Sequence, residues 1–245
     1  MIASSREKPM TSSLIISEEF VSIQGEGALV GTPSYFVRVT GCPLRCSWCD
    51  EPSTSWTPKG ERRTVNSILG RIGASGLRHV VITGGEPFSQ AATVELAIAL
   101  RVFGLHVTIE TSGAVARPEL VCDLLSISPK LAHSTPKRRG ENLADRHNRL
   151  RYNPELLRSL IDVSVGDWQI KAVVRPGNDK DIGELLTLLN DAKVSDIARV
   201  FLVPEGVDAA ALDAGLRALA PVCIKHGFRL GHRLHLSLYG NTPGT

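Results

Sequence analysis

The stretch YFVRVTGCPLRCSWCD, from Tyr35 to Asp50, decides both the fold class and the kind of site. Its first six residues are mostly apolar and β-branched, which predicts a buried strand over residues 35–40. The next residues place Cys42, Cys46 and Cys49 on one short loop at the carboxyl end of that strand. Three thiols so close together are typical of a metal site in a reducing cytoplasm rather than of a disulfide framework.

Similar strand-like runs recur along the chain and alternate with stretches of helical periodicity. The further predicted strands cover 79–83, 106–110, 124–128, 168–174, 199–203 and 233–238, and the predicted helices cover 64–73, 89–103, 181–191 and 208–226. Such alternation indicates parallel βαβ units. About six units are too few for a closed eight-stranded barrel. We therefore expect one α/β domain over residues 14–245, an open, partial β/α barrel with its site at the carboxyl ends of the strands.

Two segments stand outside this alternation. Residues 1–13 are polar and lack the apolar core of a secretory signal, so we expect a disordered N-terminal extension. Residues 130–153 form a basic excursion, whose charged residues include Lys137, Arg138, Arg139, Arg146, Arg149 and Arg151. We interpret the basic excursion as a solvated surface loop, with a flap over the site or a contact with an anionic partner as alternatives.

The bulk composition argues against some classes of protein. With 42% hydrophobic and 22% charged residues, the chain lies near the average of globular proteins, and no apolar run approaches the length that spans a membrane. The net charge of +3 is too small to indicate a nucleic-acid binder. We therefore expect a cytoplasmic protein with no membrane or nucleic-acid partner.

The number of cysteine ligands separates the possible metal sites. A structural zinc site takes four ligands, and an electron-transfer 4Fe-4S cluster takes four cysteines. Cys122 and Cys223 lie in apolar stretches and are predicted to be ordinary buried thiols. A cluster held by three cysteines leaves one iron open to a substrate. The alternative is a zinc site completed by a distant histidine, for which the candidates are His79, His133 and His232.

A second motif, VVITGGEP from Val80 to Pro87, ends the next predicted strand. Its glycines let the backbone approach a ligand, and Glu86 can accept a hydrogen bond from an ammonium group. Alone, the string would be a turn before a helix that begins at Pro87. Together with the cysteine spacing, Gly41 and Asp50, it resembles the radical S-adenosylmethionine (AdoMet) superfamily. The resemblance implies a partial β/α barrel of the radical AdoMet type, in which a 4Fe-4S cluster binds AdoMet and reductively cleaves it to a 5'-deoxyadenosyl radical.

Further motifs narrow this resemblance. They are FVSIQGEG at 20–27, GTPS at 31–34, FVR at 36–38, ETSG at 110–113, ISPK at 127–130 and QIK at 169–171. From about Phe20 to the last residue, the pattern resembles the 7-carboxy-7-deazaguanine synthase family of queuosine biosynthesis. The resemblance implies conversion of 6-carboxy-5,6,7,8-tetrahydropterin to 7-carboxy-7-deazaguanine with loss of ammonia, during which AdoMet is regenerated.

The resemblance also implies roles for individual residues. The substrate would be bound by Ile23, Gln24, Gly25, Arg38, Thr83 and Thr245, and the residues closest to the chemistry would be Glu26, Arg38 and Lys171. The AdoMet site would comprise Trp48, Cys49, Asp50, Gly84, Gly85, Glu86, Thr111, Ser112, Ser128, Pro129, Lys130, Val203, Pro204 and Glu205. Arg38 suits a bidentate pair with the substrate carboxylate. The last residues would fold into the site, so that Thr245 presents its carboxylate there.

Glu51 is the one departure from the family pattern. The family usually has a threonine at this position, whose hydroxyl ligates a Mg2+ ion that also holds the substrate. A glutamate is also a hard oxygen ligand for Mg2+, although it adds reach and a negative charge. Ser53 and Thr54 are alternative ligands if the loop shifts.

Two other functions remain open on the residues alone. One is an activating enzyme for a glycyl-radical protein, and the other is a zinc-stabilised module that grips nucleic acid with the basic excursion. For the synthase, the resemblance implies an electron donor such as flavodoxin or ferredoxin, and a homodimer.

Overall fold

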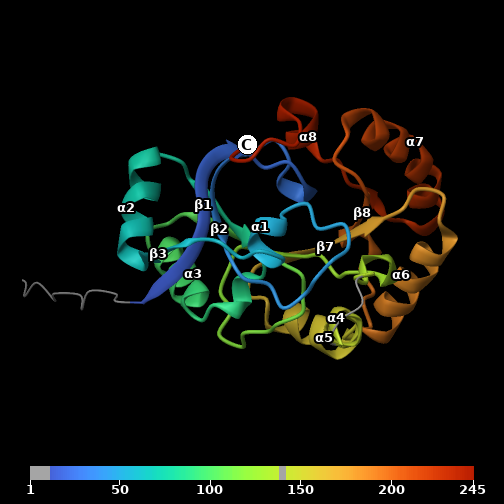
Figure 1. The fold of residues 1–245 in the computed structure, drawn as a ribbon, viewed down its shortest axis with the longest axis horizontal. Helices are drawn as coiled ribbons and strands as arrows, with labels where there is room; N and C mark the ends of the chain where they lie inside the picture. Colours follow the sequence, from blue (N-terminus) through green and yellow to red (C-terminus); the bar gives the residue numbers. More distant parts are fainter. Residues whose placement is uncertain (1–11, 138–141) are drawn as a thin grey trace, which may run out of the picture.

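A computed structural model gives the fold, and it describes residues 12–137 and 142–245 (Figure 1). Most of the predicted N-terminal extension, together with Arg138 and Arg139 of the basic excursion, lies outside the described residues. The strands of the described chain are β1 (Ser13–Ile23), β2 (Pro33–Val39), β3 (Glu61–Thr64), β4 (His79–Gly84), β5 (His106–Thr111), β6 (Leu124–Ile127), β7 (Asp167–Val174), β8 (Val200–Pro204) and β9 (Arg229–Leu230).

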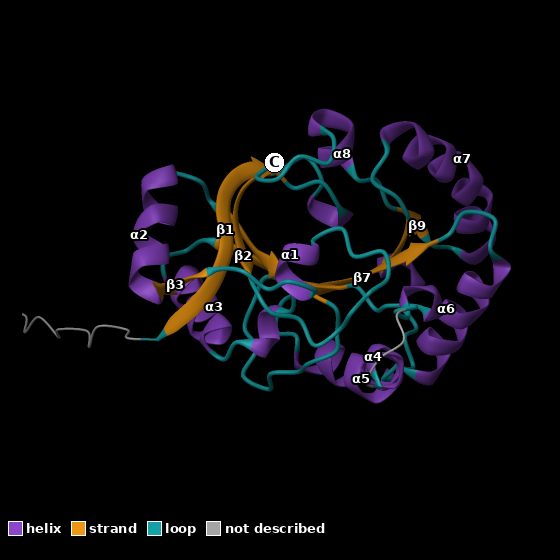
Figure 2. Ribbon diagram, in the orientation of Figure 1, coloured by secondary structure: helices purple, strands orange, loops and turns teal. Residues whose placement is uncertain are grey.

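These strands form a single sheet in the order β3-β1-β2-β4-β5-β6-β7-β8-β9. From β2 to β9 each strand runs parallel to its neighbour, whereas β1 is antiparallel to both β2 and β3. The two edge strands, β3 and β9, do not pair with each other. Figure 2 shows the strands curving in an arc that stays open, so the expected open, partial β/α barrel is confirmed.

Eight α-helices connect or follow the described strands. They are α1 (Pro52–Ser55), α2 (Val65–Ser75), α3 (Ala92–Val102), α4 (Leu143–Arg151), α5 (Pro154–Val163), α6 (Asp179–Asp191), α7 (Ala209–His226) and α8 (Leu234–Tyr239). The longer helices lie outside the arc, whereas α1 lies inside it in this view (Figure 2). None of the helices in the described residues is long and apolar enough to span a membrane.

The central strands are covered on both faces, as expected for a parallel sheet. Val80, Val81 and Ile82 in β4 are all completely buried, which explains why the strand reads as a continuous apolar run. The ends of the helices follow local signals. Thr64 caps α2 by accepting a hydrogen bond from Ser67 N at 3.2 Å, and Gly76 ends the helix with a left-handed φ of 70°.

Three expectations about local structure were wrong. The predicted strand over 233–238 is instead the helix α8, because Leu234 N donates to Gly25 O at 2.8 Å and draws the segment away from the sheet. The described part of the basic excursion is not only a loop, since it contains the short 3-10 helix η3 (Ala132–Ser134) and α4. Finally, Ser13 belongs to β1 rather than to the N-terminal extension.

Candidate active site

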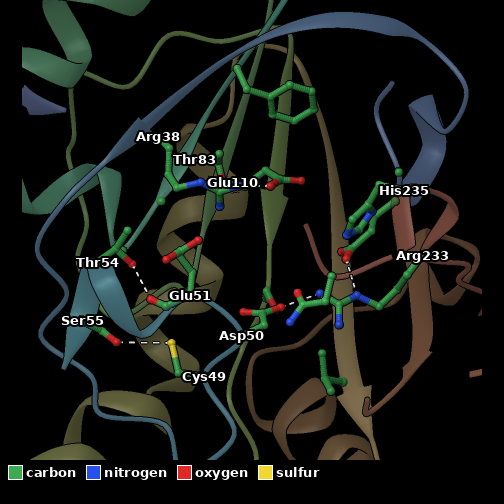
Figure 3. A pocket seen from close by; sticks show the side chains of 18 of the residues that line it. Arg38, Cys49, Asp50, Glu51, Thr54, Ser55, Thr83, Glu110, Arg233 and His235 are labelled. Carbon is green, nitrogen blue, oxygen red and sulfur yellow. Dashed lines mark hydrogen bonds and ion pairs between the residues drawn. The ribbon is translucent and has the colours of Figure 1, made fainter. Parts of the chain in front are cut away.

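A cavity of about 440 Å³ lies at the carboxyl ends of the parallel strands. Its lining includes Arg38 from β2, Thr83 from β4, Glu110 from β5 and Lys171 from β7. Ligands of open α/β sheets bind in this position. Figure 3 shows the cysteine-loop side chains on one side of the cavity, with Arg233 and His235 on the other.

The cysteine loop forms one wall of the cavity. Cys46 is buried against Leu44 and Ala114, and Cys42 and Cys49 pack against the same small group. All three are free thiols that line the cavity. Burial raises the pKa of Cys42 to about 12 and that of Cys46 to about 11, so a metal must displace protons from these thiols when it binds.

The described residues suit a cluster with three cysteine ligands. Cys122 and Cys223 lie in the main hydrophobic core, as predicted for ordinary buried thiols. Among residues 12–137 and 142–245, no group of three or more His, Cys, Asp or Glu side chains is arranged to hold a single metal ion. In a cubane each cysteine binds a different iron, so the thiols need only face a common space. The cavity supplies that space on the open side of the cluster.

The histidines considered for the zinc alternative have other partners. His79 lies in the sheet, where Nδ1 is 2.6 Å from Ser34 Oγ and Nε2 is 2.8 Å from Thr108 Oγ1. The His133 ring stacks on Trp48 at 5.4 Å between centroids, but its nitrogens face carboxylates rather than the cysteines. His232 Nε2 is 3.5 Å from Ser237 Oγ.

Two glycines hold the ends of β2 and β4 together beside the cysteine loop. Gly84 has a φ of 128°, and a Cβ there would lie 2.1 Å from Val39 O. A Cβ on Gly85 would lie 2.3 Å from Gly41 O. These close approaches permit main-chain hydrogen bonds from Gly85 N to Val39 O at 3.0 Å and from Glu86 N to Gly41 O at 2.9 Å. The cysteine wall is therefore held mainly by backbone.

Glu86 is held inside the protein by several hydrogen bonds. Its side chain is completely buried and does not line the cavity. The carboxylate accepts hydrogen bonds from Phe88 N at 3.1 Å, Thr111 Oγ1 at 2.7 Å and Ser112 N at 2.9 Å, and also from Ser112 Oγ. Burial raises the pKa of this carboxyl, which those hydrogen bonds partly offset. Glu86 thus joins the end of β4 to the end of β5.

Four charged residues, Glu26, Glu110, Lys171 and Arg233, form the opposite wall. Lys171 Nζ lies 2.9 Å from Glu26 Oε2 and 2.8 Å from Glu110 Oε1. Arg233 Nε lies 2.8 Å from Glu26 Oε1, and its Nη2 pairs with Asp50 beside the third cysteine. Figure 3 shows Arg233 and Asp50 directed toward one another across the cavity. The charged wall therefore connects residues that are distant in the sequence.

The charged wall stays ionised near neutral pH. Burial by itself would raise the pKa of the Glu26 carboxyl, but Lys171 and Arg233 outweigh burial and hold it well below its usual range. Burial likewise opposes ionisation of Lys171, whose pKa is nevertheless raised by Glu110 and Glu26. For Glu110, Lys171 outweighs burial and lowers the pKa. Each buried charge is stabilised by an opposite one.

The loop that carries Glu26 is fixed by contacts from two directions. Gln169 of β7 accepts a hydrogen bond from Ala28 N at 2.8 Å and donates one to Ser126 Oγ at 2.9 Å. On the other side, a Cβ on Gly25 would lie 1.9 Å from His235 Nδ1. Only a glycine allows this close approach of the C-terminal segment.

Arg38 keeps part of its guanidinium available. Its Nε pairs with Glu18 at 2.5 Å, and its guanidinium carbon lies 5.3 Å from the centroid of the Phe20 ring. Among the described residues, no partner engages Nη1 or Nη2. The side chain lines the cavity, so a planar fork of N–H donors remains for a carboxylate.

Glu51 also lines the cavity, at the start of α1. Its carboxylate accepts a hydrogen bond from Ser53 Oγ and forms no ion pair within the described part of the chain. Thr54 Oγ1 donates to Glu51 O at 2.9 Å, which uses the hydroxyl proton within the loop. Glu51 is therefore a carboxylate without a cationic partner in the described structure.

Most of the predicted site residues meet in this one cavity. Those that line it are Ile23, Gln24, Gly25, Glu26, Arg38, Cys42, Cys46, Trp48, Cys49, Asp50, Glu51, Thr83, Gly84, Gly85, Thr111, Ser112, Ser128, Lys130, Lys171 and Thr245. Those that do not are Glu86, Pro129, Val203, Pro204 and Glu205. Glu205 is directed at His133, with its Oε2 at 3.1 Å from Nε2.

Among the titratable residues that line the cavity, sequence reasoning gave no role to Arg233 and His235. Glu110 was noted as part of the ETSG motif, but without a role of its own. Arg233 and His235 fall in the segment wrongly predicted as a strand.

Comparison with known proteins agrees with this geometry. The family model of the radical SAM superfamily matches residues 36–189. A 7-carboxy-7-deazaguanine synthase of Rhodopirellula baltica is 43% identical over 236 residues, which cover 96% of this chain and 90% of that protein. A 7-carboxy-7-deazaguanine synthase of Halobacterium salinarum is 39% identical over 244 residues, covering 95% and 93%.

Structural comparison points the same way. The crystal structure of QueE from Escherichia coli aligns with a TM-score of 0.61 at 27% identity, covering 91% of this chain and 95% of that one. The family model covers more than half of this chain, and both relatives cover nearly all of it. The chain therefore belongs to the 7-carboxy-7-deazaguanine synthase family of the radical SAM superfamily.

Proposed function

We propose that this chain catalyses the ring contraction of 6-carboxy-5,6,7,8-tetrahydropterin to 7-carboxy-7-deazaguanine with loss of ammonia, a step of 7-deazapurine and queuosine biosynthesis. The observation that carries the proposal is one cavity with a cysteine wall on one side and a charged wall on the other. Family membership favours this reaction over both alternatives, activation of a glycyl-radical protein and a zinc-stabilised nucleic-acid-binding module.

The cysteine wall would hold the cofactors. Cys42, Cys46 and Cys49 would bind the 4Fe-4S cluster, and when bound with AdoMet the cluster supplies a one-electron cleavage that generates a carbon-centred radical. Lys130 Nζ lies 5.7 Å from the centroid of the Trp48 ring and is held by Ser128 O at 3.0 Å. These side chains would shape the AdoMet end of the cavity and give it a positive charge.

The charged wall would bind the pterin. A pterin ring presents N–H donors, and ionised carboxylates are acceptors only, so Glu26 and Glu110 suit its edge. Lys171 fixes both carboxylates, and Thr83 Oγ1 donates to Glu110 Oε2 at 2.9 Å. The free fork of Arg38 would take the substrate carboxylate. Because the wall is preorganised, the substrate would be held in one orientation for hydrogen removal.

Glu51 would hold a Mg2+ ion in this chain. Its carboxylate lines the cavity and has no cationic partner among the described residues, and Mg2+ is commonly bound by one or two carboxylates with substrate oxygens and waters. The ion would neutralise Glu51 and contact the substrate from the cysteine side of the cavity. Ser53, already bonded to Glu51, would orient the carboxylate.

The setting of the reaction is also part of the proposal. We place it in a reducing cytoplasm, because all five cysteines are free thiols. We further propose an electron donor of the flavodoxin or ferredoxin type, and a homodimer. Ile98 and Val102 on α3 and Phe103 directly after it are exposed by 43%, 77% and 63%, which offers apolar surface for a second copy.

Anaerobic reconstitution tests the function. The expected protein is brown, binds about four iron atoms per chain, and forms 7-carboxy-7-deazaguanine from the carboxytetrahydropterin with dithionite and AdoMet. Formation of deoxyadenosine without the deazaguanine would refute the substrate assignment and leave the superfamily chemistry intact. A colourless protein with one zinc per chain would contradict the cluster itself.

A further inference from the structure

The helix α4 of the basic excursion is fastened to the cysteine loop. His147 of α4 is 1% exposed, and its Nδ1 accepts a hydrogen bond from Arg45 N at 3.1 Å. Its Nε2 is 2.9 Å from Ser134 Oγ, which itself donates to Leu131 O. The imidazole thus accepts at one nitrogen and donates at the other, which fixes its tautomer. One neutral histidine therefore joins α4, η3 and the loop between two cysteines.

Further contacts bring the same segment against the cluster site. Leu150, one turn after His147, packs on the small apolar group that contains Cys42, Cys46 and Cys49. The backbone of the loop adds a hydrogen bond from Ser47 N to Ser134 O at 2.8 Å. Consequently α4 is in direct contact with the cysteine loop.

Two arginines of α4 are exposed to solvent. Arg146 and Arg149 stand three residues apart, so they are neighbours on the surface of the helix. Neither arginine forms an ion pair with a residue that the structure describes. Arg45 adds a third positive charge from the loop itself, where its Nη1 donates to Leu44 O at 2.7 Å.

Helix stability does not explain these charges. Cations stabilise the last turn of a helix, which accounts for Arg149. Arg146, however, lies in the first half of α4, where the helix dipole gives a positive charge no advantage. Arg151 pairs with Glu184, so it is not counted with these two arginines. Asp145 is the acidic residue of α4, and with three arginines the helix as a whole keeps a net positive charge.

We propose that Arg45, Arg146 and Arg149 form the docking surface for an acidic one-electron carrier protein. This inference rests on the proposed function, because a reductively cleaved AdoMet requires an electron from outside the chain. A carrier docked on α4 would be separated from the cysteine loop by the thickness of one helix. Positive charge placed there would steer an acidic partner to the position from which electron transfer is shortest.

The test reverses the charges in the reconstituted holoenzyme. In Arg146→Glu/Arg149→Glu the inward contacts of His147 and Leu150 stay intact. With reduced flavodoxin as the carrier, we expect the rate of cluster reduction, followed by stopped-flow absorbance at low flavodoxin concentration, to fall ~10-fold or more and to lose most of its salt dependence. Turnover with dithionite, a small reductant that needs no docking surface, should stay within about twofold.

Matched variants make the test specific. Arg217→Glu/Lys225→Glu reverses the same number of charges on exposed positions of α7, well apart from α4 in Figure 1, and should reduce flavodoxin-driven rates far less. Arg146→Gln/Arg149→Gln should give an intermediate effect if charge is the cause. Cluster reduction needs no pterin, so it reports on docking even if deazaguanine formation fails and the proposed function is refuted.

Three results would overturn the proposal. They are an unchanged rate of cluster reduction in Arg146→Glu/Arg149→Glu, an equal loss in the α7 control, and an equal loss of dithionite-driven turnover. The proposal would likewise be overturned if Arg146→Glu/Arg149→Glu lost affinity for a short RNA while flavodoxin still reduced its cluster at the normal rate. These arginines would then bind a nucleic acid.

Discussion

The two walls of the cavity are held together by different forces. The cysteine wall depends on main-chain hydrogen bonds between glycine turns, such as that from Glu86 N to Gly41 O at 2.9 Å. The charged wall depends on side-chain ion pairs between residues up to 207 positions apart, such as Glu26 and Arg233. A wall built from closely packed backbone is sensitive to an added side chain at its glycines, whereas a wall built from buried charges depends on the partner of each charge.

The largest effect is expected from removing the centre of the charged wall. Lys171→Met leaves Glu26 and Glu110 buried without their main partner, which should destabilise the protein by about 3–5 kcal/mol. Turnover should fall at least ~100-fold, since the pterin would no longer be held in its reactive position. Lys171→Arg is the control and should retain part of the stability and part of the turnover. Iron content that matches the unmodified enzyme would show that the cysteine wall is independent.

The second largest effect is expected from acid, which should weaken the charged wall. Glu26 and Glu110 have pKa values below the ordinary 4.5, so their stabilising contribution is present above pH 4.5 and is lost as the pH falls below it. Lys171 has a pKa above the ordinary 10.5, so its contribution is lost only as the pH rises beyond that value. We expect a loss of about 2–3 kcal/mol on acidification. Melting temperatures from pH 7 to pH 3, followed by circular dichroism, measure it.

Lys171→Met supplies the control for the acid effect. Without the lysine, the pKa values of Glu26 and Glu110 rise toward the ordinary range, so the variant should lose less stability between pH 7 and pH 3. If the melting temperature fell by the same amount in both proteins between pH 7 and pH 3, the acid sensitivity could not be assigned to the charged wall.

Gly84→Ala should damage the cysteine wall instead. The added Cβ would lie 2.1 Å from Val39 O, at a φ of 128° that residues other than glycine rarely adopt. We expect a loss of about 1–3 kcal/mol from backbone strain and a lower iron content after reconstitution. Gly183→Ala, on α6 where a Cβ meets no atom within 4 Å, is the control. Normal iron content in Gly84→Ala would show that the turn is less rigid than the geometry requires.

Arg233→Gln should separate the two walls with a smaller effect. Arg233 pairs with both Glu26 and Asp50, so its loss frees the C-terminal segment from the cysteine loop. The expected rise in KM for the pterin is about tenfold, from the loss of a charge-assisted hydrogen bond worth about 1.5–3 kcal/mol. Arg233→Lys should recover part of this loss. A fall in kcat with unchanged KM would mean that Arg233 acts on the reaction step rather than on binding.

The smallest effect on stability is expected at Glu51, where the change should appear in the metal dependence. In Glu51→Thr the carboxylate is replaced by a neutral hydroxyl, so a higher Mg2+ concentration should be needed for half-maximal turnover. Thermal stability should be unchanged, because Glu51 has no ion pair among the described residues. The measurement is turnover against Mg2+ concentration for both proteins, and coincident curves would show that Glu51 does not hold the ion.

The difference between the backbone-held cysteine wall and the ion-paired charged wall also explains which parts of the site could be predicted from the sequence. The cysteine wall is made of contiguous motifs, so Cys42, Cys46, Cys49 and the two glycines were found once the two motifs were taken together as a resemblance to a known family. The open barrel followed from the strand and helix periodicities. Lys171 was found because QIK matched a family motif, but its ion pairs with Glu26 and Glu110 could not be read from residues 61 and 145 positions away.

Failures of prediction came from contacts that override local patterns. The run from Arg233 to Leu238 alternates polar and apolar residues, which suits a strand, yet Glu26 and Gly25 draw it over the cavity as α8. The partners of Glu86 could likewise not be read from its motif. Its carboxylate accepts hydrogen bonds from Thr111 and Ser112, at the end of β5, and these could be located only in three dimensions.

The central claim is that both walls act on one pterin substrate. The most direct test is a reaction of the reconstituted enzyme with carboxytetrahydropterin in excess over AdoMet, in which 7-carboxy-7-deazaguanine and deoxyadenosine are quantified together by chromatography and mass spectrometry. We predict more deazaguanine than AdoMet supplied, with little free deoxyadenosine. Accumulation of deoxyadenosine with no deazaguanine would contradict the claim.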